Sequence, residues 1–242
     1  MGNSFRLPVT YFLREGKPNL QECLKASFEA AVFHGVQKIV IFTSAGEGVK
    51  MALDDFISRP EYSSIRLIAV TFPTGMKFTD SDGNRTSPKI SRADRQLFAE
   101  RHVPVVKAHL PFEPIKAAFG RGFLGQDLCL IGNALGIFGG GMSLCVQAVL
   151  MACDAGVIKE GEHVISTTSD TAILARASST EDFLSEFIVR QIVCKPAILT
   201  IGKKEQEVSL PAESKEGDGE TRTLEADEQH GLKSPNEPKQ LP

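Results

Sequence analysis

The chain has 242 residues, of which 42% are hydrophobic, so it is long enough to bury a sizeable core within one main domain. Its formal net charge is -3, and no basic stripe interleaved with aromatic residues runs along it, which disfavours a nucleic-acid partner. The cysteines lack metal-site spacing and the N-terminus lacks the apolar run of a secretory signal, so we expect reduced thiols and a cytoplasmic protein.

Strands are predicted wherever a short apolar run lacks polar alternation. The strong runs are residues 39–43, 67–71, 103–106 and 164–167, and weaker runs are residues 9–13 and 172–175. Such runs are typical of strands that are buried on both faces, as in a parallel sheet covered by helices.

Helices are predicted between these strands, at residues 20–33, 49–57, 91–101, 144–155 and 183–193. Asn19 is expected to cap the first helix and Gly35 to stop it, and the last helix is expected to end before Pro196. This alternation of strands and helices predicts a doubly wound α/β fold with a mainly parallel sheet in an α/β/α sandwich.

An uncharged stretch, residues 128–153, exceeds the roughly 20 residues that a membrane-spanning helix needs. Glycines, Asn133 and Gln147 interrupt it, and no cluster of Lys or Arg flanks it. We therefore expect a pair of buried helices here rather than a membrane span.

The composition changes abruptly near Lys203, after which Lys, Glu, Ser, Gly and Pro dominate and no periodic pattern could bury a face. Residues 1–202 are therefore predicted to form the α/β domain and residues 203–242 a disordered charged tail. A solubilising extension is the simpler interpretation of this tail, and attraction of a partner by its acidic residues is the alternative.

A turn rich in hydroxyl groups and glycine joins the strand at residues 39–43 to the following helix. Its candidate ligand-binding residues are Thr43, Ser44, Ala45, Gly46, Glu47 and Gly48. Ligands of parallel α/β sheets bind at the carboxyl ends of strands, and helix N-termini attract anions. The turn is neither a Walker loop nor a dinucleotide-binding loop. A plain tight turn with a helix cap is the competing interpretation, and Glu47 would repel a phosphate unless it pointed outward.

Further turns follow the strands at residues 67–71 and 164–167 and should meet the same edge of the sheet. A run of glycines before the helix at residues 144–155 permits either close approach of a ligand or a sharp turn. The candidate ligand-binding residues in these segments are Thr71, Thr74, Gly75, Gly139, Gly140, Gly141, Thr167, Thr168, Ser169 and Thr171. Hydroxyl groups with little positive charge suit phosphate or sugar oxygens, so together these turns predict a site for a small phosphorylated molecule.

The sequence offers no arrangement typical of catalysis or of a metal site. The histidines have no metal-ligand spacing, and neither Thr43 nor Ser169 lies in a nucleophile elbow. We therefore assign no catalytic residue. The alternative is a flavin-dependent or phosphate-ester-processing enzyme that uses Thr43, Ser44 or Asp170.

Several segments resemble a known family. Residues 38–71, from KIVIFTSAGEG to LIAVT, resemble the C-terminal α/β domain of pyruvate kinase, whose Thr/Ser/Gly turn holds an effector phosphate. Residues 9–19, 138–158 (FGGGMSLCVQAVLMACDAGVI), 170–177 (DTAILARA) and 188–196 are similar in sequence and order to stand-alone proteins named for that domain.

The resemblance implies a sandwich without the catalytic barrel, so pyruvate kinase activity is not expected. It implies a regulatory or ligand-sensing domain, with flavin mononucleotide (FMN) as a candidate ligand, and we expect a homo-oligomer. The sequence departs from the family pattern at two places, so the family's ligand contacts cannot be assigned to this chain in detail. Residues 167–169 lead directly to Asp170 without the family's basic, glycine-rich stretch, and Gln147 occupies a position that is commonly acidic.

Overall fold

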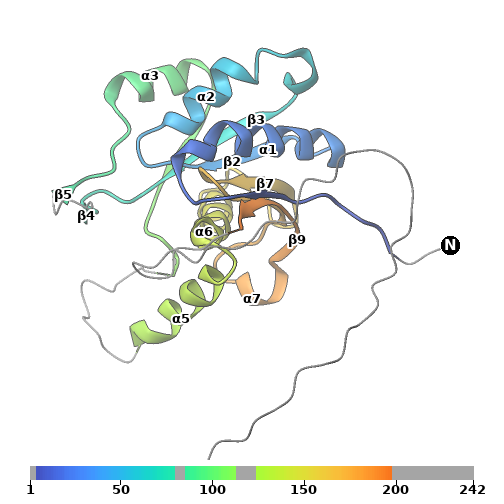
Figure 1. Cartoon of the computed structure of the whole chain (residues 1–242). Coiled ribbons are helices and arrows are strands. Elements are labelled where there is room, and N and C mark those ends of the chain that lie inside the picture. The colour runs from blue at the N-terminus through green and yellow to red at the C-terminus, as the bar shows by residue number, and fades with distance from the viewer. Residues whose placement is uncertain (1–3, 80–84, 113–123, 198–242) are drawn as a thin grey trace, which may run out of the picture. The chain divides into compact units, whose positions relative to one another are not determined.

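A computed structural model describes residues 4–79, 85–112 and 124–197 of the chain (Figure 1). The tail predicted for residues 203–242 lies outside the described residues. The described part is built on a seven-stranded sheet in the order β1-β9-β8-β7-β2-β3-β6. Its strands are β1 (Thr10–Phe12), β2 (Lys38–Phe42), β3 (Arg66–Thr71), β6 (Val105–Lys107), β7 (His163–Thr167), β8 (Ala172–Arg176) and β9 (Ile188–Pro196).

Strand β8 runs antiparallel to its neighbours β7 and β9, and every other neighbouring pair in this sheet is parallel. A separate two-stranded sheet pairs β4 (Phe78–Thr79) with β5 (Arg85–Thr86). The helices are α1 (Leu20–His34), α2 (Glu47–Asp55), α3 (Arg92–Glu100), α5 (Leu124–Gly136), α6 (Gly140–Asp154) and α7 (Phe183–Glu186), with short 3-10 turns at Lys17–Asn19 and Pro60–Tyr62.

Helices cover both faces of the sheet, which confirms the predicted α/β fold class (Figure 1). One buried cluster joins the inner faces of α1, α2 and α3 to residues such as Ile39 and Leu67. A second cluster joins α6 to Val40 and Ile68 on the opposite face of the same strands. Consecutive residues of β2 and β3 thus face different layers, which explains their apolar runs without polar alternation.

Helix α1 illustrates how the sequence sets the local structure. Its buried residues recur at helical spacing, from Cys23 and Leu24 to Phe28 and Ala31. Gly35 ends the helix, as predicted, in a left-handed conformation with φ of 66°. Asn19 precedes the helix, but its side chain makes no capping hydrogen bond and instead donates to the carbonyl oxygen of Arg14.

The prediction of a helix at residues 183–193 is wrong over most of its length. Only α7 is helical there, and the chain continues as β9, which pairs with β8 on one side and β1 on the other. Apolar residues at helical spacing suggested a helix, but Val189, Ile192 and Val193 are β-branched and favour a strand. The strands on either side, β8 and β1, provide the backbone hydrogen-bond partners of β9.

The uncharged stretch at residues 128–153 is divided between α5 and α6, with the break at residues 137–139. Helix α6 is buried, whereas α5 exposes Leu130, so the expected pair of buried helices is confirmed for α6 alone. Within the described ranges, none of the helices has both the length and the apolar character that crossing a membrane requires.

The described cysteine side chains are free, buried thiols. Cys23 Sγ lies 3.3 Å from Cys194 Sγ and 3.2 Å from Thr167 Oγ1. Burial raises the pKa of Cys145 well above its ordinary value, so this thiol stays protonated. These groups therefore act as small apolar core residues.

Replacing Gly35 tests the end of α1. Gly35→Ala should destabilise the fold by about 1 kcal/mol, because alanine is strained in the left-handed region although no atom lies within 4 Å of the added Cβ position. Gly35→Asn should cost less, since asparagine tolerates this conformation. Urea unfolding compares the three proteins, and an alanine variant as stable as the wild type would contradict the assignment.

Candidate functional site

The carboxyl ends of three predicted strands meet at one edge of the sheet, as expected. Parallel pairing sets Ile41 of β2 opposite Thr167 of β7, and Phe42 of β2 opposite Val70 of β3. The turns that follow β2 and β7 therefore lie beside each other, and β1 ends at the same edge.

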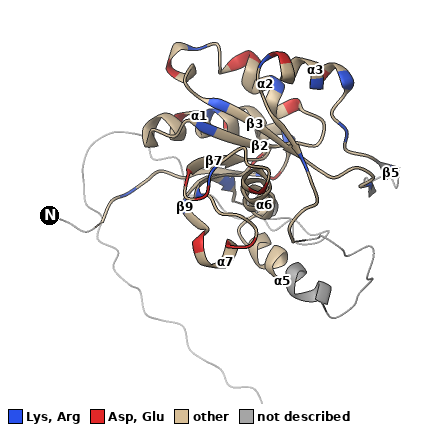
Figure 2. Cartoon of the chain, turned by 180° about the vertical axis from the view of Figure 1, so that it is seen from behind, with Lys and Arg blue, Asp and Glu red and all other residues tan. Residues whose placement is uncertain are grey.

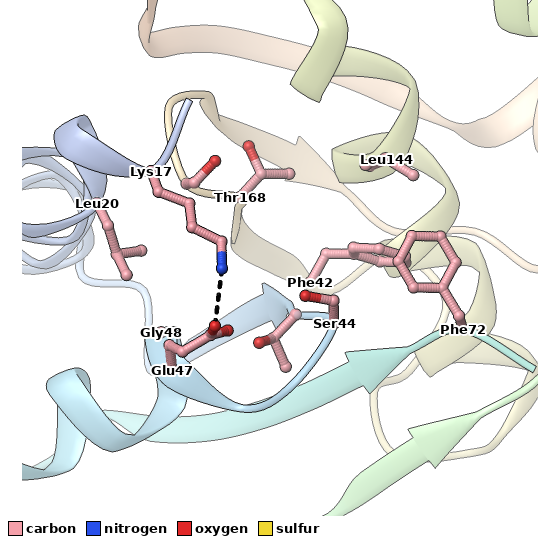
Figure 3. A pocket seen from close by; sticks show the side chains of 11 residues that line it. Lys17, Leu20, Phe42, Ser44, Glu47, Gly48, Phe72, Leu144 and Thr168 are labelled. Atoms are coloured by element: carbon pink, nitrogen blue, oxygen red, sulfur yellow. Dashed lines mark hydrogen bonds and ion pairs between the residues drawn. The ribbon is translucent and has the colours of Figure 1, made fainter. Parts of the chain in front are cut away.

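A pocket of about 160 Å³ opens between these turns (Figure 3). Residues from both turns line it, together with residues from the segment before α1, the first residue of α1, the loop after β3 and α6. The lining residues are Lys17, Leu20, Phe42, Thr43, Ser44, Glu47, Gly48, Phe72, Leu144, Thr168 and Ser169.

The turn after β2 is held by its own hydrogen bonds. The Gly46 amide donates to Thr43 Oγ1 at 2.9 Å, and the Thr43 amide donates to the Val70 carbonyl oxygen at 2.9 Å. Gly46 has a φ of 99°, and α2 begins at the next residue. The first amides of a helix have no partner within it, so that of Gly48, which lines the pocket, is available there. The Glu47 amide bonds to its own side-chain carboxylate.

Two hydroxyl groups of the pocket are also available. Ser44 and Ser169 line it from the turns after β2 and β7, and both residues are half-buried. Across the part of the chain that the structure describes, neither side chain makes a hydrogen bond to another residue. These hydroxyl groups are free to bind a ligand oxygen.

An ion pair crosses the mouth of the pocket. Lys17 reaches from the segment before α1 to the first residue of α2, and its Nζ lies 2.9 Å from Glu47 Oε1 (Figure 3). The hydrogen bond from Lys17 lowers the pKa of Glu47 below its ordinary value. Sequence reasoning missed Lys17, although its place just after a weak predicted strand was a usable signal.

A buried carboxylate holds the Lys17 segment in place. Asp170 Oδ2 accepts a hydrogen bond from the Gly16 amide at 2.7 Å, and its Oδ1 accepts one from Thr171 Oγ1 at 3.0 Å. Asp170 is 7% exposed and does not line the pocket. It therefore joins the β7–β8 turn to the segment that carries Lys17.

One wall of the pocket is apolar. Phe42 and Phe72 meet edge to face with ring centroids 4.7 Å apart, and Leu144 lies on the same side, whereas Leu20 lies across the pocket near Lys17 (Figure 3). The pocket thus sets hydroxyl and amide groups opposite carbon surface. This arrangement suits a small ligand with one anionic end and one carbon end.

Of the predicted site residues, Thr43, Ser44, Glu47, Gly48, Thr168 and Ser169 line this pocket. The others do not line it: Ala45, Gly46, Thr71, Thr74, Gly75, Gly139, Gly140, Gly141, Thr167 and Thr171. Thr74 and Gly75 are exposed in the loop after β3, and Thr167 bonds to buried neighbours. Thr71 lines a different cavity.

Within the glycine run, Gly141 has a packing role. Gly140 and Gly141 belong to the first turn of α6, where the sequence predicted a loop. A Cβ at position 141 would lie 2.5 Å from Thr168 Oγ1 and would also overlap Thr171. Glycine at position 141 therefore lets α6 approach the β7–β8 turn.

Within residues 4–79, 85–112 and 124–197, no group of three or more His, Cys, Asp or Glu side chains is arranged to hold a metal ion. The polar groups that the pocket offers a ligand are hydroxyls, a backbone amide, one lysine and the Glu47 carboxylate.

No family model matches the chain. Among solved structures it is similar to the crystal structure of Cryptosporidium parvum pyruvate kinase, with 13% identity, a TM-score of 0.31, and coverage of 68% of this chain and 24% of that one. A second pyruvate kinase structure from the same organism matches at 13% identity and a TM-score of 0.31, over 66% of this chain and 23% of that one. The α/β fold class itself rests on the sheet and helices described above.

Replacing Gly141 tests the packing of α6 on the turn. Gly141→Ala should destabilise the protein by about 1–3 kcal/mol, because the added methyl group overlaps the hydroxyls of Thr168 and Thr171. Gly132→Ala in α5 is the control, since its Cβ would lie 3.7 Å from Ser143 Oγ, an ordinary contact. Urea midpoints compare the variants, and equal stability of Gly141→Ala and wild type would refute the packing role.

The ion pair predicts a pH dependence. The folded-state pKa of Glu47 is depressed, so the stabilisation from Lys17 should be present above the unfolded-state pKa and should disappear as the pH falls through the folded-state pKa. Lys17→Met should raise the pKa of Glu47, measured by NMR titration of its carboxyl carbon. Lys25→Met, which removes a charge that does not contact Glu47, is the control. An unchanged pKa in Lys17→Met would contradict the pairing.

Proposed function

We propose that this domain binds a small phosphorylated ligand in a regulatory or ligand-sensing role, without pyruvate kinase activity. The observation that carries the proposal is the convergence of unbonded Ser44 and Ser169 hydroxyls on one pocket, at the N-terminus of α2. Helix N-termini favour anions because their first amides and the helix dipole both attract negative charge. A phosphate here would accept hydrogen bonds from the amide of Gly48 and from both serine hydroxyls.

Charge at the pocket is consistent with a phosphate because Lys17 offsets Glu47. A carboxylate beside a phosphate is repulsive, and the sequence left this repulsion unresolved. Lys17 Nζ lies 2.9 Å from Glu47 Oε1, so the pair is close to neutral. Lys17 also brings a donor, 74% exposed, to the mouth of the pocket, where its ammonium group can contact a ligand oxygen while it stays paired with Glu47.

The volume of the pocket limits the size of the ligand. About 160 Å³ is below the range of about 300–1,000 Å³ that encloses drug-sized ligands. A phosphate and a short polar chain match this volume, with the carbon atoms against Phe42, Phe72 and Leu144. For FMN, we propose that the phosphate end alone lies in the pocket, with the ring system outside it.

The proposal predicts that serine hydroxyls contribute directly to binding. A Ser44→Ala/Ser169→Ala double variant should bind inorganic phosphate about tenfold more weakly in isothermal titration calorimetry, because two hydrogen bonds of about 0.5–1.5 kcal/mol each are lost. Thr74→Ala is the matched control, since Thr74 is an exposed hydroxyl residue that does not line the pocket. Equal affinity in the double variant and the wild type would refute the proposal.

The absorbance spectrum of the freshly purified protein adds a test for FMN. A flavin band that disappears from the double variant, at unchanged unfolding midpoint, would support binding through the phosphate. A flavin band of equal strength in both proteins would contradict it.

A further inference from the structure

A second cavity, of about 630 Å³, lies at the β6 edge of the sheet. Its lining residues include Arg95 from α3, His102 from the turn after α3, and Lys107 from β6, with the buried Thr71 of β3. None of these residues lines the pocket described above. Along β3, Leu67 and Ala69 face the α1–α3 layer whereas Ile68 and Val70 face α6, so alternation sets Thr71 toward the α1–α3 layer.

The cavity carries unneutralised positive charge. Within the described residues, Arg95, His102 and Lys107 take part in no ion pair and no side-chain hydrogen bond. The acidic residues of α3 are already engaged, since Asp94 pairs with Lys50 at 3.2 Å and Glu100 accepts a hydrogen bond from Gln96. Figure 2 shows the basic positions along α3. Cations gathered in a concave surface raise the local concentration of anions.

His102 occupies a backbone position that suits glycine. Its φ is 56°, and among the described residues it alone combines a positive φ with a side chain. It follows the end of α3, where the His102 amide donates to Ala99 and the Val103 amide donates to Phe98. Glycine is the usual residue in this left-handed position of a helix terminus. The histidine thus brings an imidazole to the cavity at a position where glycine would be more stable.

We infer that this cavity binds a small anion with at least two negative charges, either a di- or tricarboxylate or a phosphorylated metabolite. Arg95 and Lys107 would supply charge from two different elements, and His102 and Thr71 would supply hydrogen-bond donors. The cavity volume falls within the range of about 300–1,000 Å³ that is typical of small-molecule sites. Its exposed cations make it an exchanging site of moderate affinity, and salt should weaken binding there.

The test is a titration of the full chain, labelled with nitrogen-15, with pyrophosphate and separately with citrate. Either probe should shift the amide signals of residues 95–107. An Arg95→Gln/Lys107→Gln variant should bind the active probe about tenfold more weakly, since two charge contacts are lost. Arg92→Gln, on the same helix but outside the cavity lining, is the control and should bind like the wild type.

His102→Gly separates a ligand role from a structural one. It should raise the thermal unfolding midpoint, because glycine suits the left-handed backbone, while it lowers the affinity for the active probe at least twofold. Signals of residues 95–107 that stay unmoved by millimolar pyrophosphate and citrate would overturn the inference. Shifts confined to residues 43–48 would also overturn it and would support the phosphate pocket alone. Equal affinity in the glutamine double variant would overturn it too.

Discussion

The candidate phosphate pocket depends on the parallel pairing of β2 with β7. With Ile41 opposite Thr167, the turns after the two strands leave the sheet at the same edge and next to each other. A shift of this register by one residue would move each side chain of β7 to the opposite face of the sheet. Because both faces are packed into buried clusters, the packing of the core determines the register. The same core packing that stabilises the domain therefore also sets Ser44 beside Ser169.

Asp170 extends this constraint to a third segment. Its carboxylate bonds to the Gly16 amide, 154 residues away in sequence, and so sets the position of Lys17 above the pocket. Gly141 allows α6 to approach the same turn from the other face of the sheet. A turn that is held on both sides has few alternative conformations, which reduces the entropy lost when a ligand binds. Ser169 lies on this turn, and Ser44 lies on the neighbouring turn after β2, which the Gly46–Thr43 hydrogen bond holds.

Much of the fold could be predicted because each buried strand is an apolar run and α1 ends at a glycine that adopts a left-handed conformation. The edge at which the turns meet followed from the parallel sheet. The sequence did not predict that residues 188–196 form a strand, because the spacing of their apolar residues also fits a helix. Pairing with β8 and β1 makes this segment a strand. Lys17 was missed because its partner Glu47 lies 30 residues away. The expected homo-oligomer stays a prediction, and the exposed Tyr11 and Phe33 are compatible with it.

The two cavities offer different groups to an anion. The pocket at the β2 and β7 ends offers mainly neutral donors and one lysine paired with Glu47, whereas the cavity at β6 offers Arg95, Lys107 and the imidazole of His102 in a more open setting. A crystal structure of the protein grown with inorganic phosphate tests phosphate binding in the pocket at the β2 and β7 ends most directly. Our account predicts a phosphate within hydrogen-bonding distance of the Gly48 amide and of Ser44 Oγ. An ordered turn at residues 43–48 with no phosphate against it, at millimolar phosphate, would contradict the account.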